Sequence, residues 1–275
     1  TPNEISYSTL INKAQTYQQG FDLFEDMKKA GLKIDEITYS TLINKAQTYQ
    51  QSFDLFEEMK QAGVTPNEIS YNTIINKAQT YQQGFDLFEE MKQAGLKIDE
   101  ISYSTLINKA QTYQQSFELF EDMKQAGLTP NEISYSTLIN KAETYQQSFD
   151  LFEEMKKAGL TPNEISYNTL INKAETYQQG FELFEEMKKA GLTPNEISYS
   201  SLINKAETYQ QGFELFEEMK KAGLTPNEIS YSSLINKAET YQQGFDLFEE
   251  MKKTGLVPGV LNFRHFGYFF FTPDS

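Results

Sequence analysis

Pairs of carboxylates are the first groups in this sequence that could do chemistry, because two nearby carboxyl groups can act as general acid and general base. Asp22 and Asp26 form such a pair, and acidic pairs recur at the same place every 32 residues. An active site instead needs one concave pocket with a few perturbed groups. The sequence also has no Gly-rich phosphate loop, no Ser/His/Asp set and no metal-ligand spacing. We therefore expect no enzyme, no cofactor, no metal site and no small-molecule substrate.

Two polar positions vary among segments that are otherwise nearly identical, and both carry hydrogen-bonding groups. The first follows the tyrosine of each Glu-Ile-(Ser/Thr)-Tyr segment, and the second directly precedes the next such segment. At the second position Asp, which only accepts hydrogen bonds, alternates with Asn, whose amide can also donate. The first position holds Ser8, Ser40, Asn72, Ser104, Ser136, Asn168, Ser200 and Ser232. The second holds Asp35, Asn67, Asp99, Asn131, Asn163, Asn195 and Asn227, with Gly259 at the end of the series. Drift among tolerated polar residues would also produce such exchanges.

A fixed period of 32 residues organises the chain of 275 residues. Segments opening Glu-Ile-(Ser/Thr)-Tyr begin at Glu4, Glu36, Glu68, Glu100, Glu132, Glu164, Glu196 and Glu228. Self-similarity at such a period indicates a repeat array rather than two globular domains. We expect the array to occupy residues 1–259 and a non-repeat hydrophobic tail to occupy residues 260–275.

Each repeat contains two helical patterns. In the first, here called helix A, apolar residues recur at i, i+3, i+4 and i+7, namely Tyr7, Leu10, Ile11 and Ala14. Asn3 is the expected N-cap of this helix. Thr16 and Gln19 have the spacing of a capping box, which predicts that a second helix, helix B, begins almost where helix A ends. Its expected buried face carries Tyr17, Phe21, Phe24 and Met27, and Gly31 ends it.

A single helical hairpin leaves one apolar face in water, so neighbouring repeats must stack to bury it. The sequence therefore predicts an all-α fold, an α-solenoid forming a right-handed superhelix of eight helix-turn-helix repeats. Ile5, Ser8 and Asn12 share another face of helix A, at i, i+3 and i+7. We expect that face to be an exposed groove wall with one apolar and one hydrogen-bonding side chain per repeat.

Composition limits the partners and the compartment. The net charge of −15 argues against a protein held to nucleic acid by bulk charge alone. The absence of Cys fits a reducing intracellular compartment without proving one. No run of about 18 apolar residues occurs and no targeting segment is visible, so we expect no membrane span.

Three recurring motifs resemble the pentatricopeptide repeat. They are Tyr-Asn-Thr-Ile-Ile at 71–75, Leu-Phe-Glu-Glu-Met-Lys at 55–60 and Ala-Gly-Leu-Thr-Pro-Asn at 126–131. The resemblance covers residues 1 to 258, although this unit is three residues shorter than the thirty-five-residue unit of the family, at the junction between helices A and B. It implies sequence-specific binding of single-stranded RNA, one base per repeat, for RNA processing or stability.

The family's base-reading residues correspond to the two variable positions described above. The resemblance implies seven reading pairs, which predict a site near 5′-GAUAACA-3′, and it leaves the eighth repeat unread because Gly259 has no side chain. The residues that would sandwich successive bases are Ile5, Ile37, Ile69, Ile101, Ile133, Ile165, Ile197 and Ile229. Weaker phosphate contacts are expected from Lys13, Lys45, Lys77, Lys109, Lys141, Lys173, Lys205 and Lys237.

Other interpretations stay open. Solenoids of paired helices also hold peptides, so a protein- or peptide-binding scaffold without RNA binding is the alternative, and an acidic groove would prefer basic peptides. The near-identity of the copies fits a recent expansion or a designed consensus equally well. In the tail, Arg264 and His265 lie in an aromatic run, for which a terminal cap, a loosely packed strand or an aggregation-prone end is favoured over a metal site.

Overall fold

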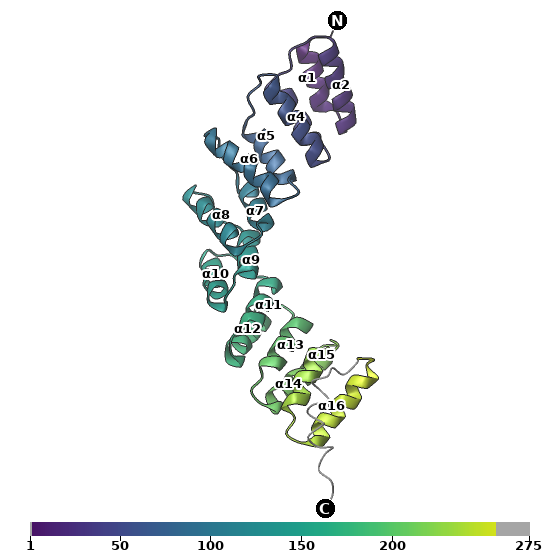
Figure 1. The fold of residues 1–275 in the computed structure, drawn as a ribbon, viewed down its shortest axis with the longest axis vertical. Coiled ribbons are helices and arrows are strands. Elements are labelled where there is room, and N and C mark those ends of the chain that lie inside the picture. The colour runs from purple at the N-terminus through teal and green to yellow at the C-terminus, as the bar shows by residue number, and fades with distance from the viewer. Residues whose placement is uncertain (1, 257–275) are drawn as a thin grey trace, which may run out of the picture. The chain divides into compact units, whose positions relative to one another are not determined.

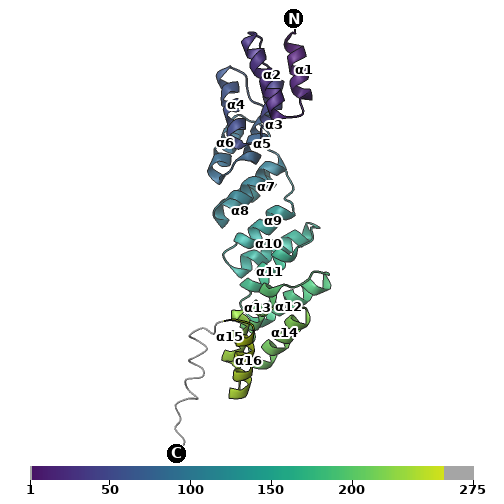
Figure 2. The same cartoon turned by 90° about the vertical axis from the view of Figure 1, so that its right-hand side faces the viewer.

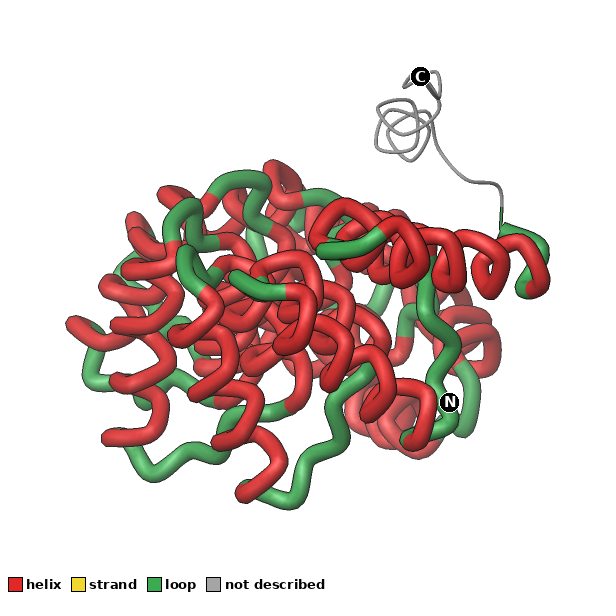
Figure 3. The backbone as a smooth tube through the Cα atoms, turned by 90° about the horizontal axis from the view of Figure 1, so that it is seen from below, coloured by secondary structure: helices red, strands yellow, loops and turns green. Residues whose placement is uncertain are grey.

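The computed structural model describes residues 2–256, and every regular element in that range is a helix (Figures 1 and 3). The A helices are α1 (Glu4–Lys13), α3 (Glu36–Lys45), α5 (Glu68–Lys77), α7 (Glu100–Lys109), α9 (Glu132–Lys141), α11 (Glu164–Lys173), α13 (Glu196–Lys205) and α15 (Glu228–Lys237). The B helices are α2 (Tyr17–Lys29), α4 (Tyr49–Gln61), α6 (Tyr81–Gln93), α8 (Tyr113–Gln125), α10 (Tyr145–Lys157), α12 (Tyr177–Lys189), α14 (Tyr209–Lys221) and α16 (Tyr241–Lys253). The expected all-α fold of eight helix-turn-helix repeats is confirmed.

The ends of the helices lie where the sequence places them, because each end has its own cap. The side chain of Asn3 accepts a hydrogen bond from the backbone N–H of Ser6, which satisfies a free donor of the first turn of α1. The Thr48 side chain and Gln51 form a complete capping box at the start of α4. Gly31 has a φ of 66°, a backbone conformation that favours glycine, and it follows the last turn of α2.

The described chain divides into two compact units, residues 2–137 and residues 138–256. Within each unit, helix A contacts helix B of its own repeat and helix A of the next repeat (Figure 2). The helices α2, α4, α6, α10, α12 and α14 each also contact the helix A that follows them. The residues of the proposed tail, 260–275, and Gly259 lie outside the described residues.

The core of each unit is built from the apolar stripes of both helices. Phe56 of α4 and Tyr71 of α5 pack edge to face, with ring centroids 4.9 Å apart, and both rings are buried. Met59 of α4 is also fully buried.

Two details of the core differ from the sequence-based expectation. Leu10 is 51% exposed, whereas Leu42, at the same position of the next repeat, is fully buried, because α1 has no described repeat before it. Tyr17 and Phe21 are half-buried rather than buried.

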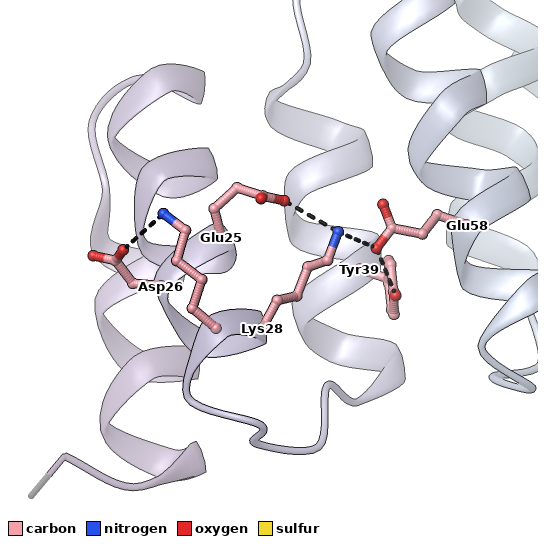
Figure 4. Close-up of polar contacts among 6 residues, drawn as sticks. Glu25, Asp26, Lys28, Tyr39 and Glu58 are labelled. Atoms are coloured by element: carbon pink, nitrogen blue, oxygen red, sulfur yellow. Dashed lines mark hydrogen bonds and ion pairs between the residues drawn. The ribbon is translucent and has the colours of Figure 1, made fainter.

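Within each unit, ion pairs join successive B helices. Figure 4 shows the first of them, between α2 and α4. Lys28 lies 3.1 Å from Glu25 of its own helix and 2.9 Å from Glu58 of the next B helix. The hydroxyl of Tyr39 donates to the same Glu58. Burial and the Glu58 carboxylate raise the pKa of Tyr39 to about 12, so the hydroxyl keeps its proton and the hydrogen bond at neutral pH. Lys60, Glu90 and Tyr71 repeat the arrangement one step along.

None of the described helices is both long enough and apolar enough to cross a membrane. Residues 2–256 also contain no group of three or more His, Cys, Asp or Glu side chains placed to hold a metal ion.

Candidate functional site

A row of isoleucine side chains marks one face of the A helices. Ile5 is 75% exposed and Ile229 is 55% exposed, and the six equivalent residues lie between these values. Each is the second residue of its helix, beside the capped first turn, where the helix does not need it for the core. An apolar side chain exposed at the same place in every repeat gives the surface a regular series of apolar contact points. The assignment of these residues as contacts for bases stays a prediction.

The second variable position is the N-cap of the following A helix. The Oδ1 atom of Asn67 accepts from the backbone N–H of Ser70 at 2.9 Å and from the Ser70 hydroxyl at 3.1 Å. Because both donors need the oxygen, the amide nitrogen of Asn67 must point away from the helix. In the repeat that carries Asp99, one carboxylate oxygen accepts from the backbone N–H of Ser102 at 2.7 Å. The backbone therefore fixes which atom of this position faces outward.

The first variable position is less exposed than its place on a groove wall suggested. Ser40 and Ser104 are each only 8% exposed, and Asn72 is 9% exposed. At these residues the expected exposed groove wall is instead buried, because the first turn of the next A helix covers the position. Ser8, Ser136, Asn168 and Ser232 are half-buried. The Ser40 hydroxyl lies 2.9 Å from that of Ser70, which is fully buried.

The two variable positions lie together, although they are 27 residues apart in the sequence. The Ser40 hydroxyl lies 3.5 Å from Asn67 Oδ1, and the Asn131 amide donates to the Ser104 hydroxyl at 3.2 Å. A pocket of about 260 Å³ opens at this point of the surface. Its lining includes Ile37, Ser40, Asn44, Asn67 and Ile69. The equivalent pocket one repeat earlier, about 480 Å³, is lined by Ile5, Ser8, Asp35 and Ile37 among others.

A third polar position, which the sequence analysis did not single out, joins the other two. It is the third residue of helix A, a Ser or Thr in every repeat, and it is almost completely buried at Thr38, Ser70, Ser102, Ser134, Ser166, Ser198 and Ser230. Its hydroxyl bonds the first variable position of the preceding repeat, as Thr38 does with Ser8 at 2.8 Å. Its position three residues after an N-cap was the sequence signal that could have identified it.

Lysines at the end of helix A face the preceding repeat. The ammonium group of Lys77 donates to the carbonyl oxygens of Ile43 and Ala46, each at 2.7 Å, and lies 3.2 Å from the Ser52 hydroxyl. Lys173 has the equivalent contacts in the second unit. These carbonyl groups end the preceding helix A and have no partner within it. Burial lowers the pKa of Lys77, since it disfavours the charged form.

Electrostatics at the pocket differ between repeats. The pocket at Asp35 also contains Lys33 and Lys13, while the pocket at Asn67 contains Lys45. Glu36 accepts a hydrogen bond from the Asn67 amide, so the outward-facing donor of Asn67 already has an anionic partner. The amide group of Asn67 carries a second N–H, which can donate to a ligand atom while the first stays bonded to Glu36.

Comparison with known proteins identifies the repeat. A model of the pentatricopeptide repeat domain matches residues 22–78 and 86–143. A model described as the PPR repeat family matches residues 141–174, 173–207 and 205–239. Together the two models match more than half of the chain. No curated protein matches the sequence.

A solved structure shows the same fold at low sequence identity. The crystal structure of the pentatricopeptide repeat protein PPR10 from maize is 22% identical, with a TM-score of 0.52, and the match covers 96% of this chain. This chain spans only 41% of that protein. The structure of PPR10 in complex with an 18-nt psaJ RNA element is 21% identical, with a TM-score of 0.43, covering 96% of this chain and 46% of the other. The likeness to the first of these two structures concerns the fold alone.

Proposed function

Because the chain belongs to the pentatricopeptide repeat family, we propose that it binds single-stranded RNA and reads one base per repeat. A role in RNA processing or stability would follow from such binding. The observation that carries the proposal is the pocket between Ile37 and Ile69, which contains both variable residues of one repeat, Ser40 and Asn67. A base between the two isoleucines would bury its two faces against their side chains, and its edge would contact the two polar groups.

The N-cap geometry supplies a chemical reason for recognition at the second position. With its oxygen held by Ser70, Asn67 can only donate to a base, which suits the bare ring nitrogen of adenine or cytosine. With one oxygen held by the Ser102 N–H, Asp99 can only accept, which suits the ring N–H of uracil or guanine. Helix formation itself therefore prevents the amide from rotating into the wrong orientation.

The first position would then sort bases by size. A short Ser leaves room for a purine, and the longer Asn reaches a pyrimidine. The proposed pairing is Ser8 with Asp35 for G, Ser40 with Asn67 for A, Asn72 with Asp99 for U, Ser104 with Asn131 and Ser136 with Asn163 for A, Asn168 with Asn195 for C, and Ser200 with Asn227 for A. If the RNA runs parallel to the chain, as is usual in the family, the site is 5′-GAUAACA-3′.

Phosphate binding contributes less to this proposal than base contacts. Lys77 and Lys173 already donate to carbonyl groups of the preceding repeat, so their hydrogen-bonding capacity is largely used. The net charge of −15 opposes long-range attraction of a polyanion. Recognition would therefore rest mainly on the pockets.

Fluorescence anisotropy with two labelled oligonucleotides tests the proposal. We expect 5′-GAUAACA-3′ to bind at least tenfold more tightly than 5′-GUUUACA-3′, in which the adenines facing Asn67 and Asn131 are replaced, because each loses a hydrogen-bond acceptor. Equal affinity would contradict the proposed code. If neither RNA binds while a basic peptide does, the chain is a peptide-binding scaffold instead.

A further inference from the structure

The buried hydroxyl at the third residue of helix A changes its acceptor according to the residue that it faces. Where the preceding repeat has Ser at the first variable position, that Ser can itself donate, so the buried hydroxyl can pass its own proton to the N-cap oxygen. Ser70 lies 2.9 Å from Ser40 and 3.1 Å from Asn67 Oδ1, and Ser134 lies 3.1 Å from Ser104 and 3.2 Å from Asn131 Oδ1. Where that position is Asn72, the hydroxyl of Ser102 donates to Asn72 Oδ1 at 2.9 Å. In the second unit, the hydroxyl of Ser198 likewise has its shortest contact with Asn168 Oδ1, while the N-cap oxygen of Asn195 lies farther away at 3.3 Å.

The redirected hydroxyl at Asn72 has a clear consequence for the amide. Ser102 is fully buried, and Asn72 is 9% exposed. A hydroxyl carries one proton, and its shortest acceptor here is Asn72, since Asn76 Oδ1 lies farther away at 3.5 Å. With its oxygen bonded to Ser102, Asn72 directs its amide nitrogen away from Ser102.

We propose that Ser102 and Ser198 are positioning residues that orient the amides of Asn72 and Asn168, and thereby select a pyrimidine. The proposal rests on the RNA binding proposed above. An outward-facing amide nitrogen donates to the carbonyl O2 that uracil and cytosine share. At the corresponding place guanine carries an amino group, which is itself a donor, so an amide held in this orientation rejects it.

Loss of the Ser102 hydroxyl would free the Asn72 amide to rotate by a half-turn. Its oxygen could then accept from the guanine amino group while Asp99 accepts from the guanine ring N–H. The choice between uracil and cytosine would not change, because it depends on Asp99 at the base ring nitrogen. At the third base, the preference for U over G therefore reports on Ser102, and the preference for U over C reports on Asp99.

The test compares Ser102→Ala and Ser102→Thr with the unmodified protein. Binding is measured to 5′-GAUAACA-3′, 5′-GAGAACA-3′ and 5′-GACAACA-3′, which differ only at the third base. For Ser102→Ala we expect the preference for U over G to fall about tenfold, with the preference for U over C retained. Ser102→Thr should restore the U over G preference, since Thr38 already occupies the equivalent position beside Ser8.

Ser134→Ala is the matched control. Ser134 is equally buried, but it faces Ser104, a hydroxyl 3.1 Å away that has no second orientation to lose. It should leave both ratios at the third base unchanged. Each ratio comes from one protein sample, so a partial loss of folded protein cancels. An unchanged U over G ratio in Ser102→Ala, with the unmodified protein still preferring U, would overturn the positioning role alone. If the unmodified protein binds none of the three RNAs, the proposed function fails as well.

Discussion

At the scale of single residues, the polar groups of each pocket serve the helix before they serve any ligand. Asn67 and Asp99 cap A helices, and this local duty fixes the orientation of their outward-facing atoms. A residue that was free in solution would offer either face of its amide. Residue identity at a cap therefore translates directly into a donor or an acceptor in the pocket.

Exchange of one reading pair for another should move base preference without altering the fold. We expect Asn72→Ser combined with Asp99→Asn to shift the preferred third base from U to A by about tenfold, because Asn at the cap donates where Asp accepts. Both new residues already occur at these positions in the neighbouring repeats, at Ser40 and Asn67. Competition binding with A and U at the third base measures the shift.

The sixth base is the internal control for this exchange. It faces Asn168 and Asn195, which the double variant leaves unchanged, so its proposed preference for C should persist. Retention of U at the third base would mean that Asn72 and Asp99 do not read it.

At the scale of helices, a lysine from the next repeat binds carbonyl groups at the end of five A helices, namely α1, α3, α9, α11 and α13. The Lys77 ammonium group binds the last carbonyl groups of α3, where the negative end of the helix dipole favours a cation. This contact makes the lysine a C-cap across a repeat boundary. It also accounts for a cation that recurs at one position without requiring a phosphate ligand.

Removal of this cap should destabilise the array. We expect Lys77→Gln to lower the free energy of unfolding by about 1 to 2 kcal/mol, because carbonyl groups at the end of α3 lose a charged donor. Lys13→Gln is the matched control. Lys13 occupies the same position of α1, and its ammonium group has no hydrogen bond or ion pair within residues 2–256, so a change within about 0.5 kcal/mol is expected. Urea unfolding followed by circular dichroism measures both, and equal losses would contradict the capping role.

At the scale of the whole molecule, charge and pocket chemistry point in different directions. The net charge is −15, yet the pocket between Ile37 and Ile69 is lined by apolar side chains, uncharged polar side chains and Lys45, with no acidic residue among the described residues that line it. Lysines that would otherwise offset the acids on the A helices are engaged with backbone carbonyl groups in both units. RNA affinity, if it resides in the pockets, should depend only weakly on salt.

Salt dependence measures how many lysines meet phosphates. Eight phosphate contacts would give a slope of about −6 in log K against log salt, since each contact to a single strand contributes about −0.7. We expect a slope shallower than about −3, because Lys45, Lys77, Lys173, Lys205 and Lys237 donate to carbonyl oxygens. The slope is obtained from binding constants measured between about 50 and 200 mM salt, a range in which exposed charges are already strongly screened. A slope near −6 would show that these lysines leave the carbonyl groups for the RNA.

The amino-acid sequence by itself determined the repeat, the two helices of each hairpin and the caps that bound them. These features are local: a capping box, a glycine with positive φ and an apolar stripe each need only neighbours within one or two turns. The two variable positions were also visible in the sequence, because near-identical copies make every difference stand out.

Only the tertiary structure decided what surrounds those positions. The burial of Ser40, the hydroxyl of Ser102 against Asn72 and the carbonyl contacts of Lys77 all join residues that are 30 or more apart in the chain. Such contacts depend on how one repeat packs on the next, which periodicity within a single repeat does not specify. For an isolated hairpin, the sequence predicts an exposed groove wall and a row of lysines available to phosphates. Stacking covers the first variable position in several repeats and brings lysines such as Lys77 against the end of the neighbouring helix. The carbonyl groups there have no partner within their own helix, so the ammonium group binds them in place of water.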